Sequence, residues 1–277
     1  MAEEDVTKQI DFVVIGAMKS GTVSVSNNLR TSDTAFLIPD YFGTRPDLFG
    51  PNRHAGYEKK TLEDIESARN ERGKNLRIGH VKGDYYINRP AMEDLLTRPS
   101  LKLIMTYRDP AGRLFSHYNH SVKQGYTRLD FERWCKTEDG EYGIKLSSFG
   151  ACLSEFADRL SPERFGILSM SQTADRTALH TLCRFLGIAD PEPSPQVHHA
   201  TPKPRNRTLN YLARNSIDTL LPRGSKVNAK VNKLRQKLLL SEQKPEKPPE
   251  ALRRKWEEYF AADFETFRKL AQPFLFR

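Results

Sequence analysis

The sequence predicts an α/β domain with a central parallel sheet flanked by helices. Residues 10–16 read IDFVVIG, a short apolar and β-branched run ended by glycine, which is typical of a parallel strand buried on both faces. A tight polar loop follows at residues 19–22. Further short apolar runs then alternate with helical patterns along the chain, which is the order of elements in α/β proteins.

The individual elements follow from hydrophobic patterning. After the loop we expect a helix at 23–30, because a buried strand and a glycine loop favour one even though Val, Ser and Asn are poor helix formers. Apolar runs predict further strands at 76–82, 101–107 and 165–170. Amphipathic patterns predict helices at 62–72, 91–96, 111–124, 149–160, 174–186 and 251–270.

The chain, residues 1–277, is expected to form a single domain. Residues 39–60 are rich in Pro, Gly and aromatic residues and predict an irregular loop. Prolines punctuate 191–204, which predicts an extended loop carrying Lys203 and Arg205. The basic segment at 223–237 and the run KPEKPPE predict a mobile insertion around residues 223–250.

Composition narrows the classes of function. Lys and Arg number 44 against 35 Asp and Glu, a net charge of +9 that suits a polyanionic ligand. The charges are spread out and no arginine-rich or aromatic-interleaved motif is present, so a phosphate-bearing small molecule is favoured over nucleic acid. An acidic start and the lack of any run of about 18 apolar residues predict a cytoplasmic protein without a membrane span. Three cysteines without CxxC spacing indicate neither a disulfide framework nor a zinc site.

The loop after the first strand has the features of a phosphate site. The segment GAMKSGT places Gly16 and Gly21 so that backbone amides and the next helix N-terminus can converge on an anion. An ATP-type loop needs Lys and then Ser or Thr after the second glycine, whereas Thr22 and Val23 stand here, and the lysine is Lys19 within the loop. A plain strand-to-helix turn with a solvated lysine is the structural alternative.

A second candidate phosphate segment is YRDPAGRLFSHYNH, residues 107–120. Arg108 follows a predicted strand directly, and Ser116 lies further along the next helix. A guanidinium offers a fork of donors to phosphate, and a hydroxyl adds another. The alternative is a simple helix start with Asp109 as the cap.

Together these two segments resemble sulfotransferases that use 3′-phosphoadenosine 5′-phosphosulfate (PAPS). GAMKSGT resembles the family's 5′-phosphosulfate loop, and the second segment resembles its 3′-phosphate segment. CRFLGI at 183–188 and HHATPKPRNRTL at 198–209 are similar to the family's FLG turn and its later basic loop. The resemblance implies a P-loop-like sulfotransferase fold, with these cofactor-binding residues: Lys19, Ser20, Gly21, Thr22, Val23, Arg108, Ser116, Lys203 and Arg205.

The resemblance also implies a reaction. A sulfuryl group would pass from PAPS, without a metal, to a hydroxyl or amine of a small-molecule, carbohydrate or lipid acceptor. Lys19 would contact the leaving phosphate. The base would come from RIGHVKGDYY, where His80 and Asp84 are the candidates. Carbohydrate-modifying relatives carry a Glu near Val81, which is absent here, so His80 is preferred because imidazole titrates near neutral pH.

Several alternatives stay open from the sequence. His80 could be a packing residue. His117 and His120 could be read as metal ligands, but no third ligand has matching spacing, so polar roles on the helix surface are expected. Phe149 could stack on adenine, although core packing is favoured. A P-loop kinase or NTPase, or a non-catalytic nucleotide-binding protein of the same fold, are the competing functions.

Overall fold

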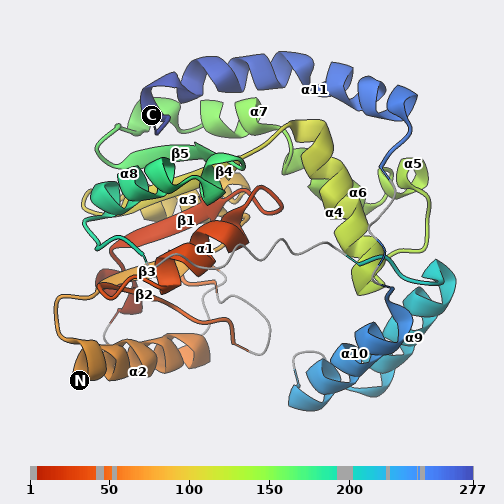
Figure 1. Ribbon diagram of the computed structural model, residues 1–277, viewed down its shortest axis with the longest axis horizontal. Coiled ribbons are helices and arrows are strands. Elements are labelled where there is room, and N and C mark those ends of the chain that lie inside the picture. Colours follow the sequence, from red (N-terminus) through yellow and green to blue (C-terminus); the bar gives the residue numbers. More distant parts are fainter. Residues whose placement is uncertain are drawn as a thin grey trace.

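The structure is a computed structural model that describes residues 5–41, 47–51, 55–191, 202–222, 225–241, 243 and 247–276. Its centre is a sheet of five parallel strands in the order β2-β3-β1-β4-β5 (Figure 1). The strands are β1 Phe12–Gly16, β2 Ala35–Leu37, β3 Arg77–Val81, β4 Lys102–Tyr107 and β5 Phe165–Ser169. The predicted fold class is therefore confirmed. Strand β2 was not predicted, because three residues are too few to show a pattern.

Helices connect the strands and extend beyond the sheet. In chain order they are α1 Thr22–Arg30, α2 Ala55–Arg72, α3 Arg89–Leu96, α4 Pro110–Gln124, α5 Phe131–Trp134, α6 Glu138–Lys145, α7 Phe149–Ser154, α8 Arg176–Leu186, α9 Arg207–Leu220, α10 Lys226–Leu239 and α11 Glu250–Ala271. Helix α10 occupies half of the segment predicted as a mobile insertion, and α9 was not predicted. Within the described residues, none of these helices combines the length and the apolar character needed to cross a bilayer.

Two hydrophobic layers cover the sheet, one on each face. Helices α1 and α8 contribute Leu29 and Leu182 to one layer, which packs on Val14 of β1. Helices α2, α3, α7 and α11 contribute to the other layer, which packs on Val13 and Ile15 of the same strand. Every residue of β1 is buried, as predicted for a parallel strand covered on both faces. The ends of the strands are therefore the part of the sheet left to contact a ligand.

A third cluster lies beside the sheet. Phe115 of α4, Trp134 of α5 and Phe260 of α11 are buried together there. Figure 1 shows α4 running from the strand ends toward α9 and α10, which lie at its far end. Asn210 of α9 fixes this contact, because its side-chain amide donates to the carbonyl oxygens of Val122 (2.8 Å) and Lys123 (3.2 Å).

The C-terminal segment closes the outer edge of the sheet. The backbone N–H of Phe276 donates to the carbonyl of Ile167 at 3.2 Å, and Leu275 forms a parallel bridge with the same residue of β5. The carboxylate of Asp263 in α11 accepts the N–H groups of Gly150 (3.0 Å) and Ala151 (2.7 Å). The residues that follow α11 therefore lie along β5, while Asp263 of α11 satisfies the first amides of α7.

Candidate active site

The strand order changes direction beside β1. After β1 the chain builds β2 and β3 on one side and then crosses to β4 on the other. In open parallel sheets, ligands bind outside the carboxyl ends of the strands at such a point. Three loops meet there, since the N–H of Met18 donates to the carbonyl of Gly83 (2.7 Å) and that of Ala17 to Thr106 (2.8 Å).

The loop after β1 leads into a helix whose first amide donors have no acceptor within that helix. Helix α1 begins after Gly21, and no side chain caps it. Its first amides, including those of Thr22 and Val23, thus have no intrahelical acceptor. Ser20 is completely buried, and its Oγ has no hydrogen-bond partner among the described residues. A buried hydroxyl and an uncapped helix N-terminus are both features that an anion can satisfy.

Position 21 requires glycine because of its backbone conformation and because there is no space for a side chain. Its φ of 99° lies in the left-handed region, and an added Cβ would lie 2.9 Å from Cγ2 of Thr173. Thr173 belongs to the turn between β5 and α8, and its carbonyl accepts from Ser24 Oγ (3.1 Å) and Asn28 Nδ2 (3.2 Å). The turn after β5 therefore fixes the start of α1 and the loop before it.

Lys19 lies in a cluster of positive charges. The pKa of its ammonium group is lowered from 10.5 to about 8, and burial is the largest cause. The remaining causes are the like charges of Lys123, Arg113 and Arg108, in decreasing order. The lysine is therefore not the solvated side chain of a plain turn, because it is largely withdrawn from water among other cations.

Several polar and basic residues of α4 share one face of the helix. Arg113, Ser116, His120 and Lys123 follow one another at spacings of three or four residues, which places them on the same side. The carboxylate of Asp109 caps this helix by accepting the N–H of Gly112 at 2.5 Å, so the cap considered from the sequence is present. Arg108 keeps a partly exposed guanidinium, with Nε 3.6 Å from Asp109 Oδ2. Capping of the helix by Asp109 is therefore compatible with a ligand-binding role for Arg108.

Arg113 joins α4 to the loop after β1, and it was not predicted from the sequence. Its side chain is fully buried, with Nε donating to the carbonyl of Met18 (3.0 Å) and Nη1 to that of Gly143 (2.6 Å). Burial lowers the pKa of this guanidinium. Its position five residues after Arg108, on the face that carries Ser116, was the available signal.

Of the two histidines of α4, His117 is buried and His120 is half-buried, which corrects the expectation of helix-surface roles. His117 is 3% exposed, with Nδ1 2.9 Å from Arg113 Nη2 and Nε2 3.2 Å from Asp139 Oδ1. Burial opposes ionisation of Asp139, but the hydrogen bonds that it accepts outweigh this and lower the pKa of its carboxyl to about 2. Burial, followed by the charge of Lys19, lowers the pKa of His120 to about 3. Within the described residues, no three His, Cys, Asp or Glu side chains are grouped as metal ligands would be.

The two candidate bases lie in different surroundings. Asp84 directly follows Gly83, whose carbonyl is bonded to the phosphate loop, and its partly exposed carboxylate accepts the Tyr142 hydroxyl at 2.8 Å. His80 is 1% exposed inside the sheet layer, with Nε2 3.4 Å from the Tyr85 hydroxyl. The structure therefore brings Asp84 to the loop and places His80 in the core.

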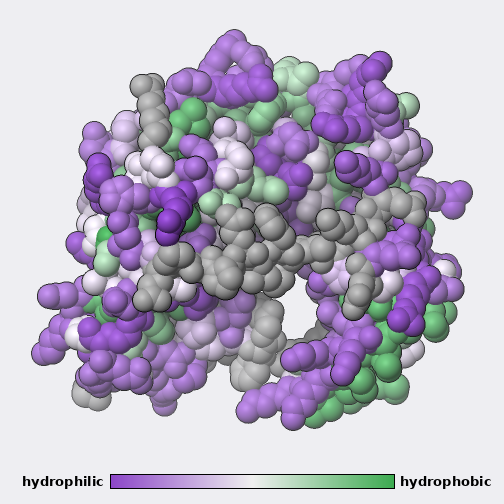
Figure 2. Space-filling view, in the orientation of Figure 1, coloured by the Kyte–Doolittle hydropathy of each residue, from purple (hydrophilic) through white to green (hydrophobic). Residues whose placement is uncertain are grey.

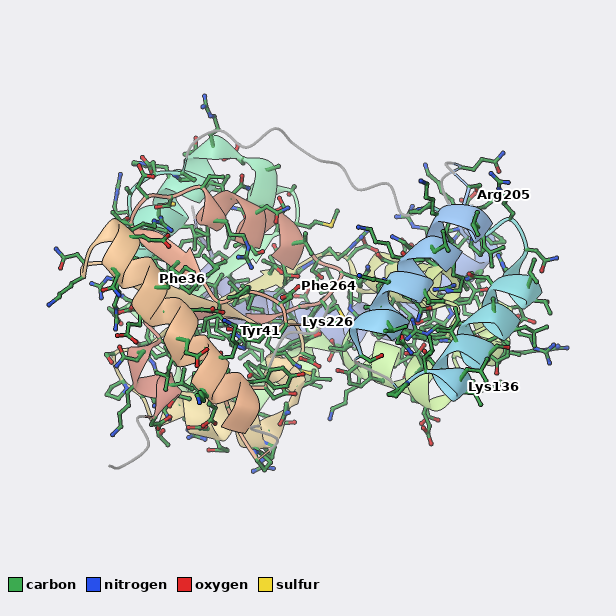
Figure 3. All side chains as sticks on the ribbon, turned by 90° about the horizontal axis from the view of Figure 1, so that it is seen from below. Phe36, Tyr41, Lys136, Arg205, Lys226 and Phe264 are labelled. Carbon is green, nitrogen blue, oxygen red and sulfur yellow. The ribbon has the colours of Figure 1, made fainter. Side chains whose placement is uncertain are left out.

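The remaining predicted residues lie apart from the loop. Lys203 and Arg205 pair through their backbones with Gln243 and Leu239, beside α9 and α10. Figure 3 shows Arg205 on the side of these helices away from the sheet. The structure therefore does not bring Arg205 to the other residues that the sequence assigned to the cofactor. Phe149 is completely buried, so core packing is its role.

The architecture matches that of solved sulfotransferases. A sulfotransferase from Alicyclobacillus acidocaldarius superposes with a TM-score of 0.62, over 95% of this chain and 96% of that chain, at 17% sequence identity. The sulfotransferase domain from the curacin biosynthetic pathway has a TM-score of 0.47, covering 91% of this chain and 97% of that one at 14% identity. The sulfotransferase domain from the Synechococcus PCC 7002 olefin synthase has a TM-score of 0.44, covering 91% and 94% at 12% identity.

No family of known sequences matches this chain, and neither does any curated protein. The structural match to the Alicyclobacillus acidocaldarius protein confirms that the chain has the P-loop-like fold of sulfotransferases, with its central parallel sheet flanked by helices.

Proposed function

We propose that residues 1–277 act as one PAPS-dependent sulfotransferase domain. A sulfuryl group passes from PAPS to a hydroxyl or amine of a small-molecule, carbohydrate or lipid acceptor in the cytoplasm. The observation that carries this proposal is the cluster around Lys19, where burial and three further cations lower the pKa of a lysine beside the unsatisfied hydroxyl of Ser20. A ligand with several negative charges and many acceptor oxygens compensates the positive charge and accepts a hydrogen bond from the serine hydroxyl.

The two phosphate groups of the cofactor have separate partners in this proposal. Lys19, Ser20 and the first amides of α1 bind the 5′-phosphosulfate. Arg108 and Ser116 bind the 3′-phosphate, because both follow β4 and neither is enclosed in the core. The assignment of Lys203 and Arg205 to the cofactor gains no support from the position of Arg205.

Sulfuryl transfer forms a bond from the acceptor oxygen or nitrogen to sulfur and breaks the bond from sulfur to the 5′-phosphate. Negative charge then grows on the leaving phosphate oxygen, where Lys19 stabilises it. The acceptor loses a proton to a base. Asp84 suits this role better than His80, because its carboxylate is partly exposed beside the loop while the imidazole is enclosed by Tyr85 and Phe49. Lys82 directly follows β3, and we assign it to orienting the sulfuryl group; its Nζ lies 3.0 Å from Asp47 Oδ1.

Calorimetric titration with adenosine 3′,5′-bisphosphate in the presence of a chelator tests the binding half of this proposal. Binding is expected without magnesium, because side chains and amides supply the positive charge. Transfer from radiolabelled PAPS to a panel of hydroxyl and amine acceptors tests the catalytic half. If ATP binds only with magnesium and the bisphosphate does not bind, the protein belongs with the kinases. Bisphosphate binding without transfer or PAPS breakdown would instead indicate a non-catalytic nucleotide-binding protein.

A further inference from the structure

The outward face of α9 and α10 is apolar. Six large aliphatic residues on these two helices are more than half exposed: Leu209 (52%), Leu212 (53%), Leu220 (78%), Val227 (57%), Leu234 (56%) and Leu238 (62%). In Figure 2 hydrophobic residues gather at the lower right, over these helices. We call this set of six residues the outer apolar face. An exposed patch of this kind usually marks an interaction site.

The inward face of the same helices is polar, which reverses the usual pattern of a surface helix. Asn210, Asn228, Asn232 and Arg235 are all buried. Arg235 donates through Nε to Asn232 Oδ1 (3.0 Å) and through Nη2 to the carbonyl of Gln124 (3.0 Å), and it is also bonded to Asn210. Hydrogen bonds thus attach the pair to α4, so the outer apolar face is not needed to hold the helices in place.

Lysines border the outer apolar face. Four exposed lysines follow the spacing of one helix face on α10: Lys226, Lys230, Lys233 and Lys237. The sequence of α10 contains no acidic residue, and the one in α9, Asp218, lies 2.9 Å from Arg214 Nε. Figure 3 shows Lys226 at the end of α10 that lies toward the sheet, so the row of lysines starts near the body of the protein.

The lysine charges distinguish between two possible binding partners for this surface, a second copy of the chain and a lipid bilayer. A second copy of the chain docked through the same face would bring lysines toward lysines, since a twofold interface uses the same patch on both subunits. A bilayer with anionic headgroups offers hydrocarbon to the leucines and phosphate or carboxylate to the lysines at the same time.

We propose that the outer apolar face and its lysines dock the protein on an anionic lipid bilayer. The helices lie in the interface, with the leucines toward the acyl chains and the lysines at the level of the headgroups. This inference does not depend on the proposed sulfotransferase activity.

Co-sedimentation with vesicles tests the docking. Binding to phosphatidylcholine vesicles with about 30% phosphatidylserine should be about tenfold or more tighter than to pure phosphatidylcholine, and it should weaken with salt. The triple variant Leu212→Ser/Leu234→Ser/Leu238→Ser should lose most of this binding. Tyr259→Ser is the matched control, because Tyr259 is an equally exposed residue (62%) on the distant helix α11.

The lysines need a separate pair of variants. Lys230→Gln/Lys233→Gln should reduce binding to the anionic vesicles, whereas Lys59→Gln/Lys269→Gln, exposed on α2 and α11, should not. Urea midpoints and bisphosphate titration of every variant show that the fold and the nucleotide site are intact. These readouts separate a failure of docking from a failure of the proposed function.

Three outcomes would overturn the proposal. The first is that the protein does not sediment with either kind of vesicle. The second is that the leucine variant binds anionic vesicles as well as the unmodified chain does, so that only diffuse charge attracts the protein. The third is a concentration-dependent dimer that the leucine variant abolishes and vesicles do not compete with, in which case the face joins two copies.

Discussion

Replacing Lys19 should stabilise the folded protein while weakening its binding of the proposed cofactor. In the folded chain, burial and neighbouring cations lower the pKa of Lys19 from 10.5 to about 8. At about 1.4 kcal/mol per pKa unit, the charged form at neutral pH lowers the free energy of unfolding by roughly 3 kcal/mol. Lys19→Met keeps the length of the side chain and removes the charge, so the variant should be more stable by up to that amount.

The pH dependence of this effect has a definite sign. Below pH 8 the lysine is charged in both folded and unfolded chains, so the advantage of the variant is at its largest. Between about pH 8 and 10.5 the folded lysine releases its proton first, and the advantage should shrink to zero. Urea denaturation at pH 7 and pH 10 measures both values, with Lys59→Met on the exposed face of α2 as the control. A Lys19→Met variant that is no more stable at pH 7, or whose advantage is the same at both pH values, would refute the reasoning.

Four further outcomes follow from the site. Arg108→Ala should weaken the bisphosphate by about 1.5–3 kcal/mol and adenosine 5′-monophosphate hardly at all, by calorimetry; equal weakening would make the arginine structural. Asp84→Asn should lower turnover by about 10²–10⁴ with bisphosphate affinity kept, and His80→Gln far less; the reverse pattern makes the histidine the base. Bisphosphate affinity should fall above about pH 8 as Lys19 loses its proton, and a flat titration profile contradicts this. Asp139→Asn should lower the free energy of unfolding by about 2 kcal/mol in urea, and an unchanged midpoint would show that its hydrogen bonds add little.

The sequence predicted the sheet well because its strands are buried on both faces and read as continuous apolar runs. Helix α9 was missed because its pattern is reversed, with polar residues such as Asn210 buried and Leu212 exposed. The loop after β1 could be singled out because its residues are contiguous in the chain, and its binding of phosphate stays a prediction. The role of Arg113 was not, because it depends on the carbonyls of Met18 and Gly143, which only tertiary structure brings together.

The position of His80 shows a second limit of prediction from the sequence. The sequence placed it near the end of a strand, where functional residues gather in parallel sheets. Side chains alternate along a strand, and His80 lies on the same face as Ile78, within the layer that holds Phe49 and Tyr85. A strand pattern shows which residues share a face, but the distance from a residue to the mouth of the site depends on the loops packed above it.

The attachment of the C-terminal segment affects how the chain can fold during synthesis. The edge strand β5 is joined to Leu275 and Phe276, and the first amides of α7 are bonded to Asp263. All of these partners are synthesised after β5, so they become available to it only later. Until then the nascent sheet has an open edge at β5, and an open edge can pair with other chains. In the interval between synthesis of β5 and synthesis of these later partners, the edge of the sheet is therefore exposed to pairing with other chains.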